Sequence, residues 1–118
     1  MSKYIIEGGR RIGGELSVHG AKNSVLPILA ASMLTRSAAL HNCPQLSDVT
    51  AACGILDYLG CKIEHGKSSI SITPGSFERC DIPDNLMREM RSSVVFLGAI
   101  IARCGKARVS LPGGCEAL

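Results

Sequence analysis

The chain has 118 residues, of which 46% are apolar and 19% charged, a composition that supports one globular domain with a real core and excludes an intrinsically disordered chain. Its net charge of +3 is mild and its lysines and arginines are scattered, so no basic stripe marks a nucleic-acid interface. With no tryptophan, two tyrosines and two phenylalanines, the chain also lacks the aromatic side chains of a single-strand stacking platform, and its core must be aliphatic.

The first part of the chain predicts two short strands and a helix. The strands lie at residues 4–7 and 15–19, with a glycine-rich loop between them. The helix spans residues 23–34, because Asn23 is a good N-cap and Pro27 falls near the first turn, where its missing N–H costs little. Apolar residues cover most of the circumference of this helix, so we expect it to be largely buried.

A strand and a second helix are predicted next. The strand covers residues 38–42 and ends before Pro44. The helix covers residues 47–59, with Ser47 as its cap, Asp48 favourable at its positive end and Gly60 as its C-terminal stop. Cys53 lies on the apolar stripe of this helix, so it is interpreted as a small buried hydrophobe.

The remaining elements complete a mixed order. Residues 61–65 and 69–73 predict a strand pair around a Gly-Lys turn. A third helix starts near Pro83 and ends at Cys104, with a break expected near Met90. A last strand at residues 108–111 leads into the turn Pro112-Gly113-Gly114-Cys115. This order of strands and helices predicts one α/β (α+β) domain.

Cys115 is the first candidate for chemistry. It follows two glycines at the end of a strand, and glycines let a ligand approach the backbone closely. A thiol presented in this way is placed to react with a bound substrate. The same residues are also compatible with an ordinary turn that ends in a buried cysteine.

Lys22 and Arg91 are candidate anion ligands. Lys22 stands at the amino end of the first predicted helix, where free backbone N–H groups and a partial positive charge suit phosphate. Arg91 leads into a strongly apolar segment, and a planar guanidinium there pairs well with phosphate. The alternatives are a solvated surface lysine and an internal salt bridge of Arg91 with a nearby carboxylate. Asn23 is explained by capping alone, and no catalytic base can be named.

Cysteine usage and hydropathy bound the cellular setting. The six cysteines form no C-x-x-C pair and do not cluster with the three histidines, so a zinc site is not expected. The amino terminus does not read as a signal peptide, which favours a cytoplasmic protein with reduced thiols. The longest apolar run, residues 94–102, is too short for a membrane span.

Several separate motifs, in order and at consistent spacing, resemble the family of UDP-N-acetylglucosamine enolpyruvyl transferases, also called UDP-N-acetylglucosamine 1-carboxyvinyltransferases. The resemblance covers nearly the whole chain. The matching pieces are Gly20-Ala21-Lys22-Asn23 and residues 26–31, 42–49, 59–62, 90–93, 97–98 and 111–115.

The resemblance implies a reaction and roles for four residues. The family transfers the enolpyruvyl group of phosphoenolpyruvate to the 3′-hydroxyl of UDP-N-acetylglucosamine and releases phosphate, the first committed step of peptidoglycan synthesis. Cys115 matches the catalytic thiol, which protonates the enolpyruvyl methylene and is alkylated by fosfomycin. Lys22 matches the catalytic lysine that binds the phosphate of phosphoenolpyruvate. Asn23 and Arg91 match substrate-binding residues. No cofactor, metal, nucleic acid or membrane is implied.

The resemblance also implies an architecture that exceeds this chain. Family members are longer and have two similar domains, each an inside-out α/β barrel of repeated strand-helix units, with the active site between them. Residues 1–21 would form strands that pack with the other domain, which is absent here, and residues 22–118 an incomplete first domain that ends at the active-site loop. We therefore expect these residues alone to lack turnover. After Cys115 the family continues with an Ile-Gly-x-Arg-Pro type of stretch, whereas this chain reads Glu-Ala-Leu.

Two other functions remain open at this point. A relative of enolpyruvylshikimate phosphate synthase would share the reaction type, but the Gly-Ala-Lys-Asn motif and Cys115 argue against it. A non-catalytic α/β interaction module would self-associate through surfaces that the missing domain would cover.

Overall fold

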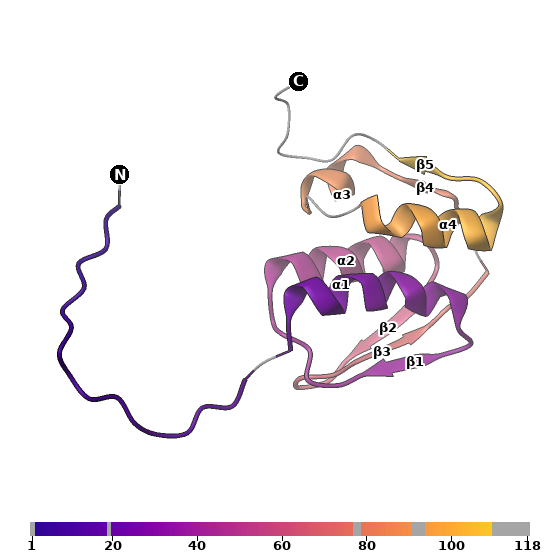
Figure 1. The fold of residues 1–118 in the computed structure, drawn as a ribbon. Coiled ribbons are helices and arrows are strands. Elements are labelled where there is room, and N and C mark those ends of the chain that lie inside the picture. The colour runs from indigo at the N-terminus through magenta and orange to yellow at the C-terminus, as the bar shows by residue number, and fades with distance from the viewer. Residues whose placement is uncertain (1, 19, 77–78, 91–93, 110–118) are drawn as a thin grey trace.

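A computed structural model describes residues 2–18, 20–76, 79–90 and 94–109 as a mixed α/β structure (Figure 1). The helical elements of this part are α1 (Lys22–Ala31), the 3-10 turn η1 (Ser32–Leu34), α2 (Ser47–Tyr58), α3 (Asp84–Arg88) and α4 (Phe96–Cys104). The strands are β1 (Ala38–Leu40), β2 (Lys62–His65), β3 (Ile70–Thr73), β4 (Asp81–Ile82) and β5 (Arg108–Val109). The predicted mixture of strands and helices is confirmed.

Strands β1, β3 and β2 form an antiparallel sheet with β3 in the centre. The side chains of β3 alternate: Ile70 and Ile72 are buried, whereas Ser71 and Thr73 are exposed. Leu40 stands opposite Ile70, and Ile63 stands opposite Ile72, so the apolar residues share one face. This alternation is typical of a sheet that packs on one side and meets water on the other. The predicted pair at residues 61–65 and 69–73 is confirmed.

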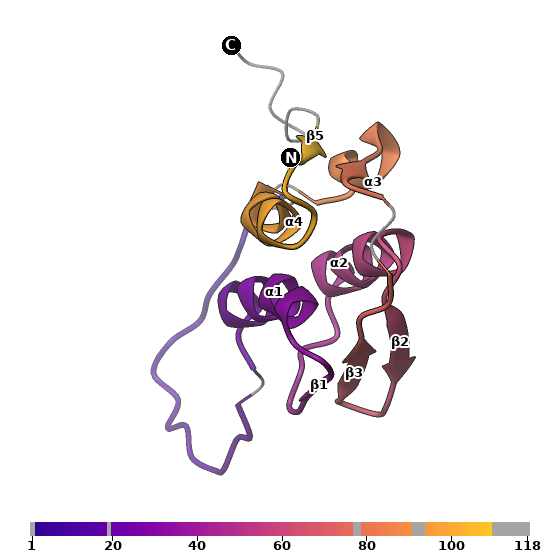
Figure 2. The ribbon, with the colours of Figure 1, turned by 90° about the vertical axis from the view of Figure 1, so that its right-hand side faces the viewer.

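The helices occupy the middle of the molecule. Helices α1 and α2 cover the sheet, and α4 lies across them on the side away from the sheet (Figures 1 and 2). Among the described residues, the fully buried core is aliphatic apart from the ring of Phe96. Its largest fully buried side chains include Phe96, Leu29, Ile55, Leu56 and Ile72. Cys53 is 5% exposed and belongs to this core, as predicted.

A second, two-stranded sheet lies beyond α4 and contains a strand that the sequence did not reveal. Strand β4 pairs with β5 in parallel, so that Asp81 stands opposite Arg108. The sequence predicted a final strand at residues 108–111; β5 covers its first two residues, and the other two lie outside the described residues. Strand β4 has only two residues, which is too short for a periodic pattern to show.

The amino-terminal segment corrects the prediction of two strands at residues 4–7 and 15–19. Residues 2–18 carry no helix or strand, and Figure 1 shows them running away from the folded body. Tyr4, Ile5 and Ile6 are each more than four-fifths exposed. A strand needs a hydrogen-bonded neighbour, and no described segment lies beside this one to pair with it. His19, at the end of the second predicted strand, lies outside the described residues.

The starts of two helices and the burial of one of them differ from the predictions. Helix α1 begins at Lys22 rather than Asn23, and α2 is preceded by Leu46 rather than capped by Ser47. Helix α1 is buried on one side only, and Ile28 is 50% exposed. The predicted break in the third helix is confirmed, since α3 ends at Arg88 and α4 begins at Phe96. Within the described ranges, no helix has the length and hydropathy to cross a bilayer.

Candidate functional site

Lys22 begins α1 and is joined to the start of α2 by an ion pair. Its Nζ lies 3.2 Å from Oδ2 of Asp48, in the first turn of α2. The Lys22 side chain is 47% exposed and that of Asp48 is 26% exposed, so the pair sits at the surface with a partly shielded carboxylate. Sequence reasoning assigned Asp48 only a favourable position on its own helix. Nothing in the local sequence reveals that the two helix starts lie side by side.

Asn23 does not cap the helix. The preceding Ala21 takes that place, and its carbonyl accepts hydrogen bonds from the N–H groups of Ser24 and Val25 at 3.2 and 3.0 Å. The helix therefore begins at Lys22, one residue earlier than the sequence indicated, and Asn23 lies exposed within its first turn. Because the Asn23 side chain does not cap the helix, it is available to contact a ligand.

The amino ends of α1 and α2 share an electrostatic property. Both are preceded by an apolar residue, Ala21 or Leu46, with no side-chain hydrogen bond to the first N–H groups. Uncapped N–H groups and the helix dipole give such an end a partial positive charge. The ammonium of Lys22 lies beside both ends, and the carboxylate of Asp48 balances its charge while leaving nearly half of the lysine side chain exposed. This arrangement suits an anion, with phosphate the best chemical match.

A hollow of about 280 Å³ borders the start of α1. Gly20, Ser24 and Ile28 form one side, and residues 40–44 form the other. Asn42 has a φ of 56°, the left-handed conformation that asparagine tolerates better than most residues. The Gly-Ala-Lys-Asn motif and the Asn-Cys-Pro motif are therefore in contact in the fold, through Gly20 and Asn42, which are 22 positions apart in the sequence.

Two of the four predicted site residues cannot be placed. Arg91 and Cys115 both lie outside the described residues. The structure thus brings Lys22 and Asn23 together in the first turn of α1, and the roles of Arg91 and Cys115 remain predictions from the sequence.

Several described cysteines are unsuited to reaction because they are buried. Burial raises the pKa of Cys53 to about 11, with a smaller contribution from the neighbouring Cys43. Burial also raises the pKa of Cys61 to about 11, and the nearby Arg103 opposes this rise. Because the thiolate is the nucleophile, Cys53 and Cys61 are inert at neutral pH.

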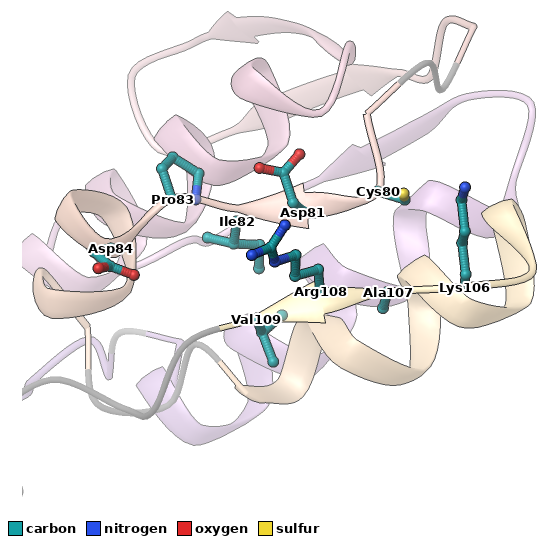
Figure 3. A pocket seen from close by; sticks show the side chains of 9 residues that line it. All are labelled: Cys80, Asp81, Ile82, Pro83, Asp84, Lys106, Ala107, Arg108 and Val109. Atoms are coloured by element: carbon teal, nitrogen blue, oxygen red, sulfur yellow. The ribbon is translucent and has the colours of Figure 1, made fainter.

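A larger hollow, of about 610 Å³, follows β4 and β5 (Figure 3). Charged side chains of both signs line it: Asp81, Asp84, Lys106 and Arg108. Lys22 and Asn23 are not among its lining residues. Sequence reasoning did not find this hollow, because it depends on a strand of two residues and on pairing across 27 positions of the chain.

Comparisons with known proteins agree with the resemblance in the motifs. The family EPSP synthase (3-phosphoshikimate 1-carboxyvinyltransferase) matches residues 6–117. UDP-N-acetylglucosamine 1-carboxyvinyltransferase 2 of Caldanaerobacter subterraneus subsp. tengcongensis is 50% identical over 117 residues, and the UDP-N-acetylglucosamine 1-carboxyvinyltransferase of Desulfatibacillum aliphaticivorans is 47% identical over 116. Each match covers 98% of this chain but only 28% of the relative.

A solved structure supports the fold. The enolpyruvyl transferase NikO from Streptomyces tendae matches with a TM-score of 0.71 at 22% identity, over 83% of this chain and 23% of NikO. This likeness concerns the fold alone, whereas the matches in sequence establish homology. The chain therefore belongs to the EPSP synthase family, as a homologue of the UDP-N-acetylglucosamine 1-carboxyvinyltransferases.

Proposed function

We propose that this chain forms part of a cytoplasmic enolpyruvyl transferase of peptidoglycan synthesis, which joins phosphoenolpyruvate to the 3′-hydroxyl of UDP-N-acetylglucosamine and releases phosphate. The observation that carries the proposal is the ammonium of Lys22, held by Asp48 between two uncapped helix ends. Both substrates are anionic, so a fixed cation beside free N–H groups is what their binding requires. The names of the homologous enzymes support the same reaction.

Each site residue has a distinct role in this proposal. Lys22 binds the phosphate of phosphoenolpyruvate, and Asn23, exposed beside it, contacts substrate. Cys115 gives a proton to the methylene carbon while the sugar hydroxyl adds to the adjacent carbon, which forms a tetrahedral intermediate. Loss of phosphate and of a proton then restores the double bond. Arg91 contacts the UDP-sugar.

We further propose that residues 22–118 belong to one α/β domain of an inside-out barrel and that residues 1–21 pack on another domain. Two features support this. Helices α1, α2 and α4 lie between the β1–β3–β2 sheet and the β4–β5 pair (Figures 1 and 2), as an inside-out barrel requires. The amino-terminal segment exposes apolar side chains, among them Ile5 and Ile12, that need a covering surface. Without such a surface, the chain would self-associate through this segment.

A chimeric enzyme tests the proposed reaction. The segment of the Caldanaerobacter relative that aligns with this chain over 117 residues is replaced by the present chain. We expect the chimera to release phosphate from phosphoenolpyruvate and UDP-N-acetylglucosamine, and the 118-residue chain alone to release none. Cys115→Ser and Lys22→Met should abolish release by the chimera, whereas the control Cys80→Ser should retain it.

Fosfomycin separates the two enolpyruvyl transfer reactions. The chimera should be alkylated at Cys115, as peptide mass spectrometry can show, and the buried Cys53 and Cys61 should stay unmodified. Turnover with shikimate 3-phosphate instead of the UDP-sugar, or equal activity in the Cys115→Ser chimera, would overturn the proposed function.

A further inference from the structure

The Lys22–Asp48 pair joins two helix ends that would otherwise repel the lysine. A cation in the first turn of a helix is unfavourable, because the helix dipole is positive there. Lys22 lies in the first turn of α1 and therefore meets this repulsion from its own helix. The amino end of α2, which is also positive, lies beside Lys22. Asp48, in the first turn of α2, is favourable on its own helix and is within 3.2 Å of the ammonium. The negative carboxylate of Asp48 therefore offsets the repulsion between the helix dipoles and the ammonium of Lys22.

The pair leaves the lysine able to bind a second anion. An ammonium group has three N–H donors, and a single carboxylate oxygen, Oδ2 of Asp48, lies within ion-pair distance of it at 3.2 Å. Nearly half of the Lys22 side chain remains exposed, so the other donors can reach solvent or a ligand. A free lysine side chain loses rotamer entropy when it binds an anion, and a lysine that is already held loses less.

From this geometry we propose that Asp48 is a positioning residue, which holds the ammonium of Lys22 in place for a phosphate group at the joined ends of α1 and α2. The inference rests on the proposed function, because it assumes that Lys22 binds the phosphate of the substrate. Asp48 acts through Lys22 and does not itself contact the substrate. Its negative charge repels a phosphate, so the benefit of holding Lys22 must exceed that repulsion.

A double-mutant cycle on the 118-residue chain separates positioning from the other roles of Asp48. Inorganic phosphate is titrated into the parent chain, Asp48→Asn, Lys22→Met and the double variant, with binding followed by the backbone amide signals of α1 and α2. We expect Asp48→Asn to weaken binding about three- to tenfold, because the lysine must then be ordered by the ligand. In the Lys22→Met background the same change should leave binding unchanged or tighter, since only the repulsion is lost.

Controls distinguish positioning from structural damage. Asp57→Asn, at the other end of α2, removes an exposed carboxylate and should leave phosphate binding unchanged. Side-chain relaxation of the Lys22 Cε group should show increased motion in Asp48→Asn but not in Asp57→Asn, while the methyl groups of Leu29 and Ile72 keep their rigidity in both.

The remaining outcomes contradict the inference in distinguishable ways. Tighter binding in Asp48→Asn with Lys22 present would show that repulsion dominates. Equal weakening with and without Lys22, or unchanged Lys22 motion, would show that Asp48 does not act through the lysine. If Lys22→Met itself left phosphate binding unchanged, the proposed phosphate site would fail, and the role of Asp48 with it.

Discussion

Gly20 approaches the backbone of Asn42 so closely that a Cβ atom on Gly20 would overlap the Asn42 carbonyl oxygen. Asn42 lies just after the end of β1 and has a left-handed φ of 56°. The contact fixes the point at which the exposed amino-terminal segment joins the folded body. Because α1 begins two residues later, it also fixes the position of Lys22.

Replacing Gly20 by alanine should therefore destabilise the chain. The added methyl group meets backbone rather than a mobile side chain, so we expect a loss of about 1–3 kcal/mol in the free energy of unfolding, measured by urea denaturation. Gly98→Ala is the control, since nothing lies within 4 Å of a Cβ at that helical position. It should stabilise the chain by about 0.5–1 kcal/mol. Equal effects of the two changes would contradict the Gly20–Asn42 contact.

Two adjacent residues of α1 should differ sharply in their contribution to stability. Leu29 is fully buried, whereas Ile28 is 50% exposed. We expect Leu29→Ala to cost about 2–5 kcal/mol, because it leaves a cavity in the core, and Ile28→Ala to cost less than about 1 kcal/mol. Urea denaturation of both variants provides the measurement. A larger loss of stability in Ile28→Ala than in Leu29→Ala would mean that Ile28, and not Leu29, faces the core.

The buried thiols predict a decline of stability at alkaline pH. The pKa of both Cys53 and Cys61 is raised from 9.0 to about 11 by burial. In the unfolded chain these thiols ionise near pH 9.0, so the unfolded state binds fewer protons than the folded state between pH 9.0 and about 11. The free energy of unfolding should therefore be unaffected by these groups below pH 9 and fall as the pH rises toward 11.

Urea denaturation at pH 8, 9.5 and 10.5 checks this expectation against the Cys53→Ala, Cys61→Ala double variant. The variant should be less stable than the parent at pH 8, because it lacks two buried side chains. Its stability should then decline less steeply as the pH rises. Parallel declines in the two proteins would assign the pH dependence to other groups.

The hydroxyl of Tyr58 links the end of α2 to β4. It donates a hydrogen bond to Oδ2 of Asp81 at 3.2 Å, and the guanidinium of Arg79 lies over its ring at 4.6 Å from the centroid. Tyr58→Phe removes the hydrogen bond and keeps the ring, so we expect a loss of about 0.5–1.5 kcal/mol. Tyr58→Leu should cost more, since the contact with Arg79 is also lost.

A double-mutant cycle with Asp81→Ala isolates the hydrogen bond. The loss caused by Tyr58→Phe should shrink toward zero when Asp81 is already alanine, as urea denaturation of the four proteins can measure. An undiminished loss would show that the hydroxyl stabilises the fold through another group.

Elements with a long periodic pattern were predictable from the sequence. The helix over residues 47–59 and the strand pair over residues 61–73 follow from apolar spacing and glycine or turn signals, and the structure confirms both. The strands predicted at residues 4–7 and 15–19 fail for a physical reason. Their residue types suit a strand, but a strand forms only where another segment can accept its hydrogen bonds.

The candidate site, like the fold, was predictable from the sequence only in part. The sequence alone singled out Lys22 and Asn23, and its motifs indicated the family to which the chain belongs. Only the tertiary structure decided that Asp48 holds Lys22, that Ala21 rather than Asn23 precedes the helix, and that β4 pairs with β5. Residue types and spacing record local preferences, whereas the ion pair and the parallel strands join residues 26 and 27 positions apart, and such contacts depend on how the packed helices place their ends.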